Sequence, residues 1–219
     1  MSSNVALVTR VMVVDDDTMV RQFLRQILTA RGLDVVAEAA DGDEVVTGVQ
    51  AHHPDVVLMD LRMARTDGVR ATAAVAALPD PPGVVAMTSF DTESAILDAV
   101  HAGAAGFLAK DSGPDELVAA VEAVAAGEGA LSPRAARVVM DQVAATPTAR
   151  GREEARAALA RLTDREREIA HGVAEGLTNA EIAGRLYLGA ATVKTHLGNA
   201  CQKLGVNRVR LALLVDRAA

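Results

Sequence analysis

Five polar side chains each end or directly follow a short apolar run in the first half of the chain: Asp15, Asp16, Asp60, Thr88 and Lys110. Carboxylates that share a crevice repel each other unless a cation neutralises them, and a set of hard oxygen ligands suits Mg²⁺. A lysine ammonium and a threonine hydroxyl supply a positive charge and a hydrogen-bond donor for an incoming phosphoryl oxygen. This set predicts phosphoryl transfer to Asp60, whose carboxylate acts as a nucleophile and forms an acyl phosphate.

The apolar runs predict the strands of a parallel sheet. Strands are expected near 11–14, 33–38, 56–60, 84–87 and 105–108, alternating with helices that end near residues 32, 51, 78, 101 and 126. This alternation predicts a doubly wound, five-stranded parallel sheet with right-handed crossovers, in the flavodoxin-like order 2-1-3-4-5 and with the fifth strand at an edge. The carboxyl ends of such strands meet at one edge of the sheet, where ligands bind, so the five polar side chains should converge there.

Two other interpretations of these five residues have to be weighed. Polar residues are common in the turns after strands, so each residue taken alone is more simply a solvated turn residue, but five of them at matching strand ends favour a binding site. A phosphotransfer or phosphatase enzyme acting on an outside substrate could use the same acids, but no residue suggests a general base over a substrate pocket.

Length and composition limit the number of domains and the cellular compartment that the chain can have. A chain of 219 residues accommodates two small domains, and its single cysteine, Cys201, excludes an internal disulfide or a Cys-rich zinc pattern. The first residues lack the basic and apolar regions of a signal peptide, and no apolar run approaches the length of a membrane span. We therefore expect a cytoplasmic protein with no membrane partner.

Charge divides the chain into two parts. Residues 1–149 hold 10 Lys or Arg and 21 Asp or Glu, a net charge of −11, whereas residues 150–219 hold 12 and 8, a net charge of +4. The division predicts an acidic module joined to one that can approach nucleic acid, although charge runs are more often solvated faces.

The C-terminal part changes from strands to short helices. Capping-box patterns at Thr163 and Thr178 each open a helix, and further helices are expected near 190–204 and 208–217. Two helices joined by a tight turn, with basic residues on the second, outline a helix-turn-helix in a four-helix, all-α domain.

The expected domain limits follow from these patterns. The first domain is expected over residues 10–127 and the second over 161–219. The linker over 128–160 should contain a helix near 133–143 and a flexible hinge over 144–156, where Pro147 and Gly151 interrupt the pattern.

The expected helix at 190–204 has an apolar face, formed by Val193, Leu197, Ala200 and Leu204, and an opposite face of small, polar and basic residues. Such a helix can enter a major groove, and an ordinary amphipathic helix with a solvated face is the alternative. The outward residues are Lys194, Thr195, Gly198, Asn199, Gln202 and Lys203. In the last helix, Val209, Leu211, Leu213 and Leu214 could form a dimer face or pack within the chain.

The segments VVDDD, DVVLMDLRMARTDG, VVAMTSF and GAAGFLAK together resemble the receiver domain of two-component response regulators, over about 11–126. The resemblance implies that Asp60 is the phosphoacceptor and that Thr88 and Lys110 bind the phosphoryl oxygens. It also implies that Asp15 and Asp16 hold Mg²⁺ with the Arg62 backbone carbonyl. Phe107 matches the aromatic residue that rotates inward with Thr88 on activation, although an ordinary core role accounts for it nearly as well.

Two residues beside the acids depart from that family pattern. Ala64 stands where the family usually has Pro, which leaves the loop after Asp60 less stiff. Asp17 adds a third acid beside the first pair, where it could tighten metal binding or cap the first helix.

The segment from Leu162 to Val206 resembles the LuxR-type helix-turn-helix, and its union with a receiver resembles the NarL/FixJ type of response regulator. The resemblance implies two sets of DNA contacts. Lys194, Thr195 and Gly198 would lie near base edges, and Thr192, Asn199 and Lys203 would lie near phosphates. Gly189 replaces the Ser that usually caps this helix, at a cost of about a few tenths of a kcal/mol.

These inferences combine into a phosphorylation-controlled, DNA-binding transcription regulator rather than an enzyme, apart from phosphoryl transfer to its own Asp60. A histidine kinase would donate the phosphoryl group, which would release or dimerise the C-terminal domain on a two-fold site in double-stranded DNA. The main alternative is a constitutive DNA-binding protein whose receiver serves only as a dimerisation platform.

Overall fold

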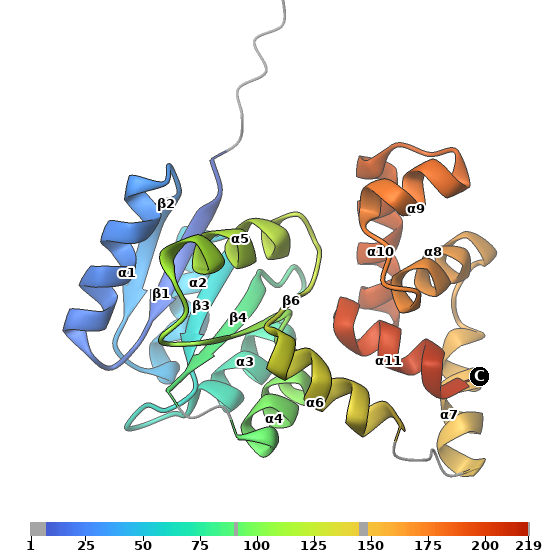
Figure 1. The fold of residues 1–219 in the computed structure, drawn as a ribbon, viewed down its shortest axis with the longest axis horizontal. Helices are drawn as coiled ribbons and strands as arrows, with labels where there is room; N and C mark the ends of the chain where they lie inside the picture. The colour runs from blue at the N-terminus through green and yellow to red at the C-terminus, as the bar shows by residue number, and fades with distance from the viewer. Residues whose placement is uncertain (1–7, 90–91, 145–148, 219) are drawn as a thin grey trace, which may run out of the picture.

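The computed structural model describes residues 8–89, 92–144 and 149–218. These residues form a parallel sheet flanked by helices, then a separate group of helices (Figure 1). The strands are β1 (Arg10–Val14), β2 (Asp34–Ala39), β3 (Val56–Asp60), β4 (Gly83–Thr88), β5 (Gly106–Ala109) and β6 (Ala130–Leu131). The helices of this first part are α1 (Thr18–Ala30), the 3₁₀ turn η1 (Gly42–Glu44), α2 (Val45–His52), α3 (Gly68–Ala76), α4 (Glu93–Ala102) and α5 (Pro114–Ala125).

The sheet has the strand order β2-β1-β3-β4-β5-β6, with every pairing parallel. The predicted doubly wound fold and the order of its first five strands are confirmed. The prediction that β5 is an edge strand is wrong, because β6 pairs with its outer side through Gly106↔Ala130 and Phe107↔Leu131. Gly106 permits this pairing, since a Cβ there would lie 2.9 Å from the Ala130 carbonyl oxygen.

We expect the substitution Gly106→Ala to destabilise the sheet by about 1–3 kcal/mol, because the added methyl group meets backbone on one side and Val85 at 3.2 Å on the other. Urea unfolding followed by circular dichroism measures the change. Gly113→Ala is the control for steric contact, since a Cβ there meets nothing within 4 Å, and any loss of stability it shows reflects only the lower preference for alanine at the N-cap of α5. Equal stability of both variants would show that β6 does not depend on this close approach.

Two hydrophobic layers hold the sheet between helices. On one face, α1 and α5 pack on β1 and β3 through residues such as Leu28 and Val121. The other face is covered by α2, α3 and α4, through residues such as Val49, Val75 and Ile96. Every residue of β3 is buried, as its continuous apolar run predicts, and the strand carries Asp60 to its carboxyl end.

The remaining helices are α6 (Pro133–Ala144), α7 (Ala149–Leu159), α8 (Asp164–Ala174), α9 (Asn179–Leu186), α10 (Ala190–Leu204) and α11 (Arg208–Ala218). Both predicted capping boxes are present, at Thr163 with Glu166 and at Thr178 with Glu181. The helices α8 to α11 share one core around Ile169, as expected for a four-helix domain.

The expected hinge over 144–156 is wrong for the part that the structure describes. From Ala149 onward the chain is helical, and α7 buries Ala155 and Leu159 against the same domain. Pro147 and Gly151 are typical of loops, which is why the local pattern indicates a hinge where a charged helix forms. Residues 145–148 of the expected hinge lie outside the described residues.

Among the described helices, none combines the length and the apolar character that a membrane crossing requires.

Candidate functional site

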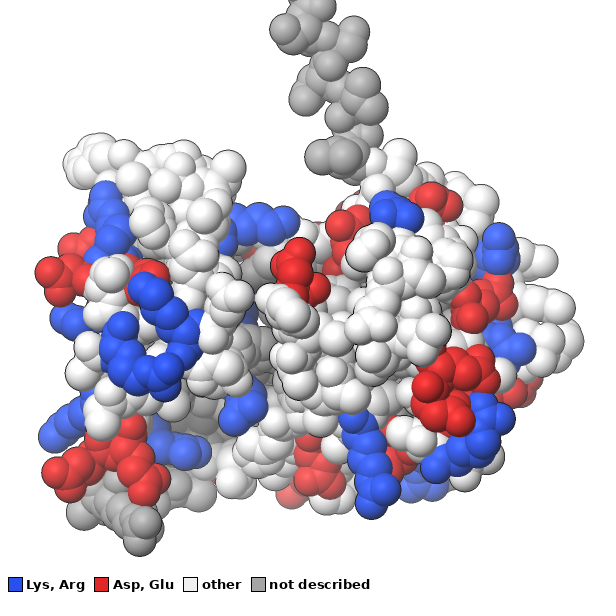
Figure 2. Space-filling model, turned by 180° about the vertical axis from the view of Figure 1, so that it is seen from behind, with Lys and Arg blue, Asp and Glu red and all other residues white. Residues whose placement is uncertain are grey.

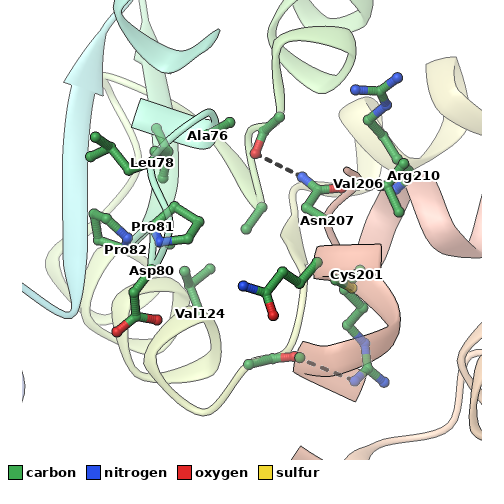
Figure 3. A pocket seen from close by; sticks show the side chains of 18 of the residues that line it. Ala76, Leu78, Asp80, Pro81, Pro82, Val124, Cys201, Val206, Asn207 and Arg210 are labelled. Carbon is green, nitrogen blue, oxygen red and sulfur yellow. Dashed lines mark hydrogen bonds between the residues drawn. The ribbon is translucent and has the colours of Figure 1, made fainter. Parts of the chain in front are cut away.

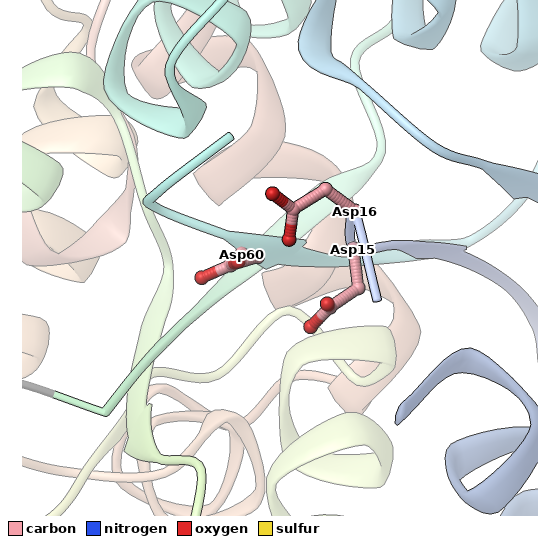
Figure 4. Close-up of side chains that lie close together, drawn as sticks. All are labelled: Asp15, Asp16 and Asp60. Carbon is pink, nitrogen blue, oxygen red and sulfur yellow. The ribbon is translucent and has the colours of Figure 1, made fainter. Parts of the chain in front are cut away.

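Three aspartates converge at the carboxyl edge of the sheet. Asp15 and Asp16 follow β1, and Asp60 is the last residue of β3, so strand pairing places them side by side (Figure 4). One carboxylate oxygen of each lies within 4.8 Å of the others. Asp15 and Asp60 are buried, with exposed fractions of 0% and 3%, whereas Asp16 is exposed. The site therefore has two buried acids and one that faces solvent.

Lys110 bridges the two buried acids. Its ammonium nitrogen lies 2.6 Å from Asp15 Oδ2 and 2.9 Å from Asp60 Oδ2. Its backbone N–H donates to the Thr88 carbonyl oxygen at 2.9 Å, which fixes the end of β5 beside the end of β4. Burial acts to lower the pKa of Lys110, but the Asp15 and Asp60 carboxylates outweigh it and raise that pKa. Lys110 therefore stays a cation at neutral pH.

Asp60 is held by a second donor besides Lys110. The backbone N–H of Arg62 donates to Asp60 Oδ1 at 3.2 Å. Burial raises the pKa of Asp60, and the nearby Asp15 charge adds to that effect, while Lys110 and the Arg62 N–H oppose it. A buried carboxylate that is costly to keep charged is stabilised by any further cation beside it.

Thr88 and Phe107 lie on the neighbouring strands. Thr88 ends β4 and is buried, as expected for a residue at this edge. Phe107 lies inside β5 and is 1% exposed, in a cluster with Ile96 of α4 and Val139 of α6. Phe107 is thus a core residue in this structure, and it connects the sheet to the linker helix.

The donor set fits a small, hard cation. Three carboxylates offer oxygen ligands, and Asp16 faces solvent, which suits an ion that keeps several waters. Asp15 Oδ2 is buried and accepts no well-aligned hydrogen bond from the described residues, the Lys110 ammonium being its ion-pair neighbour. Asp17 belongs elsewhere, because its carboxylate caps α1 by accepting from the Met19 N–H at 2.8 Å.

The outward face of α10 lies toward the sheet domain. Lys194 Nζ donates to the Ala125 carbonyl oxygen at 2.9 Å, and Gln202 reaches the Pro79 carbonyl oxygen at 3.5 Å. A cavity of about 1000 Å³ separates the two surfaces (Figure 3), and the space-filling view shows a hollow between the domains (Figure 2). Three more of the predicted DNA-contacting residues line this cavity: Thr195, Gly198 and Asn199.

One asparagine ties the helical domain to the turn between α4 and β5. Asn207 Nδ2 donates to the carbonyl oxygens of Gly103 and Ala104 at 2.8 and 2.6 Å, and the side chain points across the cavity in Figure 3. Its Oδ1 accepts from the Arg210 N–H at 2.8 Å and so caps α11. Arg210 in turn donates to the His101 carbonyl oxygen at 3.2 Å.

A second contact group lies at the end of α5. Asn179 of α9 donates from its backbone N–H to Glu128 at 3.2 Å and accepts from Arg208 at 2.7 Å. Arg208 also donates to the carbonyl oxygens of Leu177 and Gly127. Of these acceptors only the Gly127 carbonyl belongs to the sheet domain, and the Glu128 carboxylate adds a charge near the same half-buried guanidinium.

The last helix faces the sheet domain as well as its own domain. Val209 and Leu213 pack against the cluster that contains Phe107, whereas Leu211 is buried in the helical core. The side chains predicted as a dimer face therefore make contacts within the chain in this structure.

Two residues of α10 are held within the helical domain. Lys203 Nζ lies 2.7 and 2.8 Å from the two oxygens of the buried Glu166 carboxylate. Cys201 is half-buried, and burial raises the pKa of its thiol to about 11, so the thiolate is scarce at neutral pH. Thr192 is exposed on the first turn of the same helix.

We expect the Glu166 ion pair to make the helical domain sensitive to acid. Lys203, together with the Thr163 N–H and hydroxyl, outweighs burial and lowers the pKa of Glu166. A depressed pKa stabilises the fold above the ordinary pKa of glutamate, and that stability is lost as the pH falls through the folded-state pKa. Urea unfolding of Glu166→Gln should show lower stability at neutral pH and a weaker loss in acid.

The matched control for that measurement is Glu168→Gln, because Glu168 is half exposed in an ion pair with Arg165 on the same helix. Its acid response should equal that of the unsubstituted protein. An unchanged acid response of Glu166→Gln would contradict the assignment.

Some residues of this arrangement could not be predicted from the sequence. Asn207 carries a weak signal, since it stands at the start of an expected helix as an N-cap residue. Nothing in the sequence places its side chain against Gly103, and nothing distinguishes Arg208 from a solvated arginine. Asp41, which contacts the loop after Asp60, is followed by Gly42, and that pair indicates only a turn.

A sheet edge with three acids and a lysine, joined to a helix-turn-helix domain, defines a two-domain regulator. The receiver-domain family of response regulators matches residues 11–122, and the family of bacterial regulatory proteins of the luxR type matches residues 160–215. The chain therefore belongs to the response regulators that join a receiver to a LuxR-type helix-turn-helix, and the predicted NarL/FixJ type is confirmed.

Similar proteins span nearly the whole chain. The DNA-binding transcriptional activator DevR/DosR of Mycobacterium tuberculosis is 37% identical over 91% of this chain and 89% of its own length. The transcriptional regulatory protein LiaR of Bacillus subtilis is 36% identical over 95% and 97%. The crystal structure of the response regulator ChrA from a heme-sensing two-component system is 38% identical over 95% and 96%, with a TM-score of 0.53. The chain is a phosphorylation-controlled, DNA-binding transcription regulator rather than a typical enzyme.

Proposed function

We propose that Asp60 is the phosphoacceptor and that a sensor histidine kinase is the donor. The observation that carries this proposal is the position of Asp60, a buried carboxylate at the end of β3 between Lys110 and the Arg62 N–H. A carboxylate oxygen of Asp60 attacks the phosphorus of the incoming group, an acyl phosphate forms on Asp60, and the former bond to the donor breaks. The reaction is transfer to the protein's own side chain, without turnover of an outside substrate.

The other residues of the sheet edge hold the transferred group and the metal. Asp15, Asp16, Asp60 and the Arg62 carbonyl would bind Mg²⁺, which supplies positive charge against the phosphoryl oxygens when bound. Lys110 provides a second positive charge, and the Thr88 hydroxyl provides a hydrogen-bond donor. Lys110 gains a new partner in the phosphoryl oxygens, so its ion pairs with Asp15 and Asp60 change when Asp60 is phosphorylated.

This change is proposed to reach the helical domain through the β4–β5 side of the receiver. Thr88 ends β4, and Phe107 of β5 packs in one cluster with residues of α4 and α6. The turn that follows α4 contains the two carbonyl groups that accept hydrogen bonds from the Asn207 side chain. A shift of Thr88 and Phe107 therefore loosens the contact that keeps α11 against the receiver, and α10 is released.

The released domain is proposed to bind double-stranded DNA with α10 in the major groove. Lys194, Thr195 and Gly198 would lie near base edges, and Thr192, Asn199 and Lys203 near phosphates. In the present arrangement Lys194 is engaged by the Ala125 carbonyl, which supports control by release rather than constitutive binding. Freeing Val209 and Leu213 would open an apolar face of α11 to a second copy, so the phosphorylated form is proposed to be a homodimer.

The working units are proposed to be a receiver over residues 10–127, a linker over 128–160 and a DNA-binding domain over 161–219. A protein that binds chromosomal DNA in bacteria works in the cytoplasm, and that is the compartment proposed for this chain.

Intact mass after incubation with Mg²⁺ and a small acyl phosphate tests the proposal. We expect a single phosphoryl adduct in the unsubstituted protein and none in Asp60→Asn. Asp17→Asn is the matched control, because asparagine also caps a helix and Asp17 lies outside the acid cluster. An adduct that survives in Asp60→Asn would assign the phosphoryl group to another residue.

A further inference from the structure

The loop between Asp60 and α3 is anchored by a residue of a different strand end. Asp41 follows β2 and is buried, with an exposed fraction of 2%. Its Oδ2 accepts from the Arg65 N–H at 2.8 Å, and its Oδ1 accepts from the Thr66 N–H at 2.7 Å. Both carboxylate oxygens of Asp41 thus accept from the backbone of one loop, and the phosphoryl transfer proposed above gives Asp41 no role.

Other contacts hold the same loop against the turn after β2. The Arg65 guanidinium donates to Asp43 at 2.8 and 2.9 Å and to Glu44 at 2.7 Å. Gly42 approaches so closely that a Cβ there would lie 2.5 Å from the Thr66 carbonyl oxygen. The loop therefore contacts the turn closely at Thr66, and the hydrogen bonds to Asp41 fix the position of the loop relative to that turn.

This anchor acts close to the metal ligands. Arg62 follows Asp60 by two residues, and its backbone N–H donates to Asp60 Oδ1. Arg65 lies three residues further along the loop, and its backbone N–H donates to Asp41. Ala64 lies between these two points and leaves the backbone without the restriction that a proline would impose. The hydrogen bonds to Asp41 therefore restrain the loop, and with it the direction of the Arg62 carbonyl, in place of the restriction that a proline ring would supply.

We propose that Asp41 is a positioning residue for phosphorylation of Asp60: it fixes the loop so that the Arg62 backbone is held ready for Mg²⁺. This inference rests on the proposed function. Burial acts to raise the pKa of Asp41, but the Arg65 and Thr66 N–H groups and the Arg65 charge lower it, so the anchor stays charged at neutral pH. Residues that orient metal ligands from outside the coordination sphere contribute about 10–100-fold to metal affinity.

The test compares Asp41→Ala and the isosteric Asp41→Asn with the matched control Asp43→Ala. The control removes the exposed ion pair between Arg65 and Asp43 but leaves the pair with Glu44 and both backbone hydrogen bonds on Asp41 in place. Three quantities are measured on the full chain: amide hydrogen exchange of Arg65 and Thr66 without metal, the Mg²⁺ dissociation constant by calorimetry, and the Mg²⁺ dependence of Asp60 phosphorylation. A thermal melt of each variant shows that it is folded.

In Asp41→Ala we expect faster exchange of both amides and a Mg²⁺ dissociation constant raised about 10-fold or more. The Mg²⁺ concentration for half-maximal phosphorylation should rise in parallel, while the rate at saturating Mg²⁺ stays within about twofold. Asp41→Asn keeps one carbonyl acceptor and should lie between Asp41→Ala and the unsubstituted protein. Asp43→Ala should remain within about twofold of the unsubstituted protein, because exposed ion pairs contribute little.

Faster exchange with an unchanged Mg²⁺ dissociation constant would overturn the inference, because the anchor would then be structural alone. A lower rate at saturating Mg²⁺ with unchanged affinity would also overturn it. These results differ from a failure of the proposed function, in which the unsubstituted protein itself would gain no phosphoryl group on Asp60.

Discussion

The substitution Lys110→Met should lower the free energy of unfolding of the metal-free receiver by about 3–5 kcal/mol, the usual cost of removing one partner from a buried ion pair. Lys110 is the ammonium between Asp15 and Asp60, and both carboxylates are almost fully buried. Methionine fills much of the same space but leaves two neighbouring negative charges without a counter-charge. Urea unfolding followed by circular dichroism measures the loss.

Mg²⁺ distinguishes this electrostatic cause from simple loss of packing. In the unsubstituted protein the ammonium and the metal would share the same carboxylates and repel each other, so Mg²⁺ should stabilise Lys110→Met more than it stabilises the parent. Acid should also reduce the penalty, because burial raises the pKa of Asp60 and the loss of Lys110 raises it further, so that the carboxyl group becomes neutral as the pH falls through that raised value.

Lys203→Met is the matched control for this prediction, because Lys203 also pairs with a buried carboxylate, Glu166, but lies in the helical domain. Its loss of stability should not respond to Mg²⁺. If Mg²⁺ stabilises Lys110→Met and the parent equally, Lys110 does not share its carboxylates with the metal.

The substitution Asn207→Asp should raise the DNA affinity of the unphosphorylated protein by roughly an order of magnitude. Aspartate caps α11 as well as asparagine does, so the helix is retained. The two donors to Gly103 and Ala104 are lost, and a carboxylate then faces two carbonyl oxygens. Losing two hydrogen bonds costs about 2 kcal/mol, which alone shifts the equilibrium between docked and released domains by roughly 30-fold toward release.

The gain in affinity appears only while the docked state dominates, because affinity scales with the fraction of released molecules. Fluorescence anisotropy with a labelled DNA duplex measures both states. Phosphorylated Asn207→Asp should bind like the phosphorylated parent, and this comparison is the control for altered DNA contacts. Equal affinity of the unphosphorylated variant and parent would show that Asn207 does not hold the domains together.

The chemistry-bearing residues are predictable because strand ends obey a simple geometry. Asp60 closes a run of β-branched residues, and parallel pairing with β1 necessarily places it beside Asp15 and Asp16. The helix-turn-helix is predictable for a similar reason, since the capping boxes at Thr163 and Thr178 mark helix starts locally.

Features that depend on two distant segments are not predictable in this way. The strand β6 has only two residues and forms because Gly106 leaves room for Ala130, which no local pattern reveals. The docking of Lys194 on Ala125 and of Asn207 on Gly103 depends on how the domains meet. The helix α7 has no clear local signal because its stability comes from burying Ala155 and Leu159 against the helical domain, rather than from propensity.

If a phosphoryl group on Asp60 releases α10 for DNA, the DNA affinity of one protein preparation should change on phosphorylation. The measurement compares that affinity before and after phosphorylation, using a duplex with a two-fold site selected from random sequences by the phosphorylated protein. We expect tighter binding after phosphorylation and no change in Asp60→Asn treated in the same way. Equal affinity before and after phosphorylation, with the adduct present on Asp60, would contradict it and indicate a constitutive DNA-binding regulator.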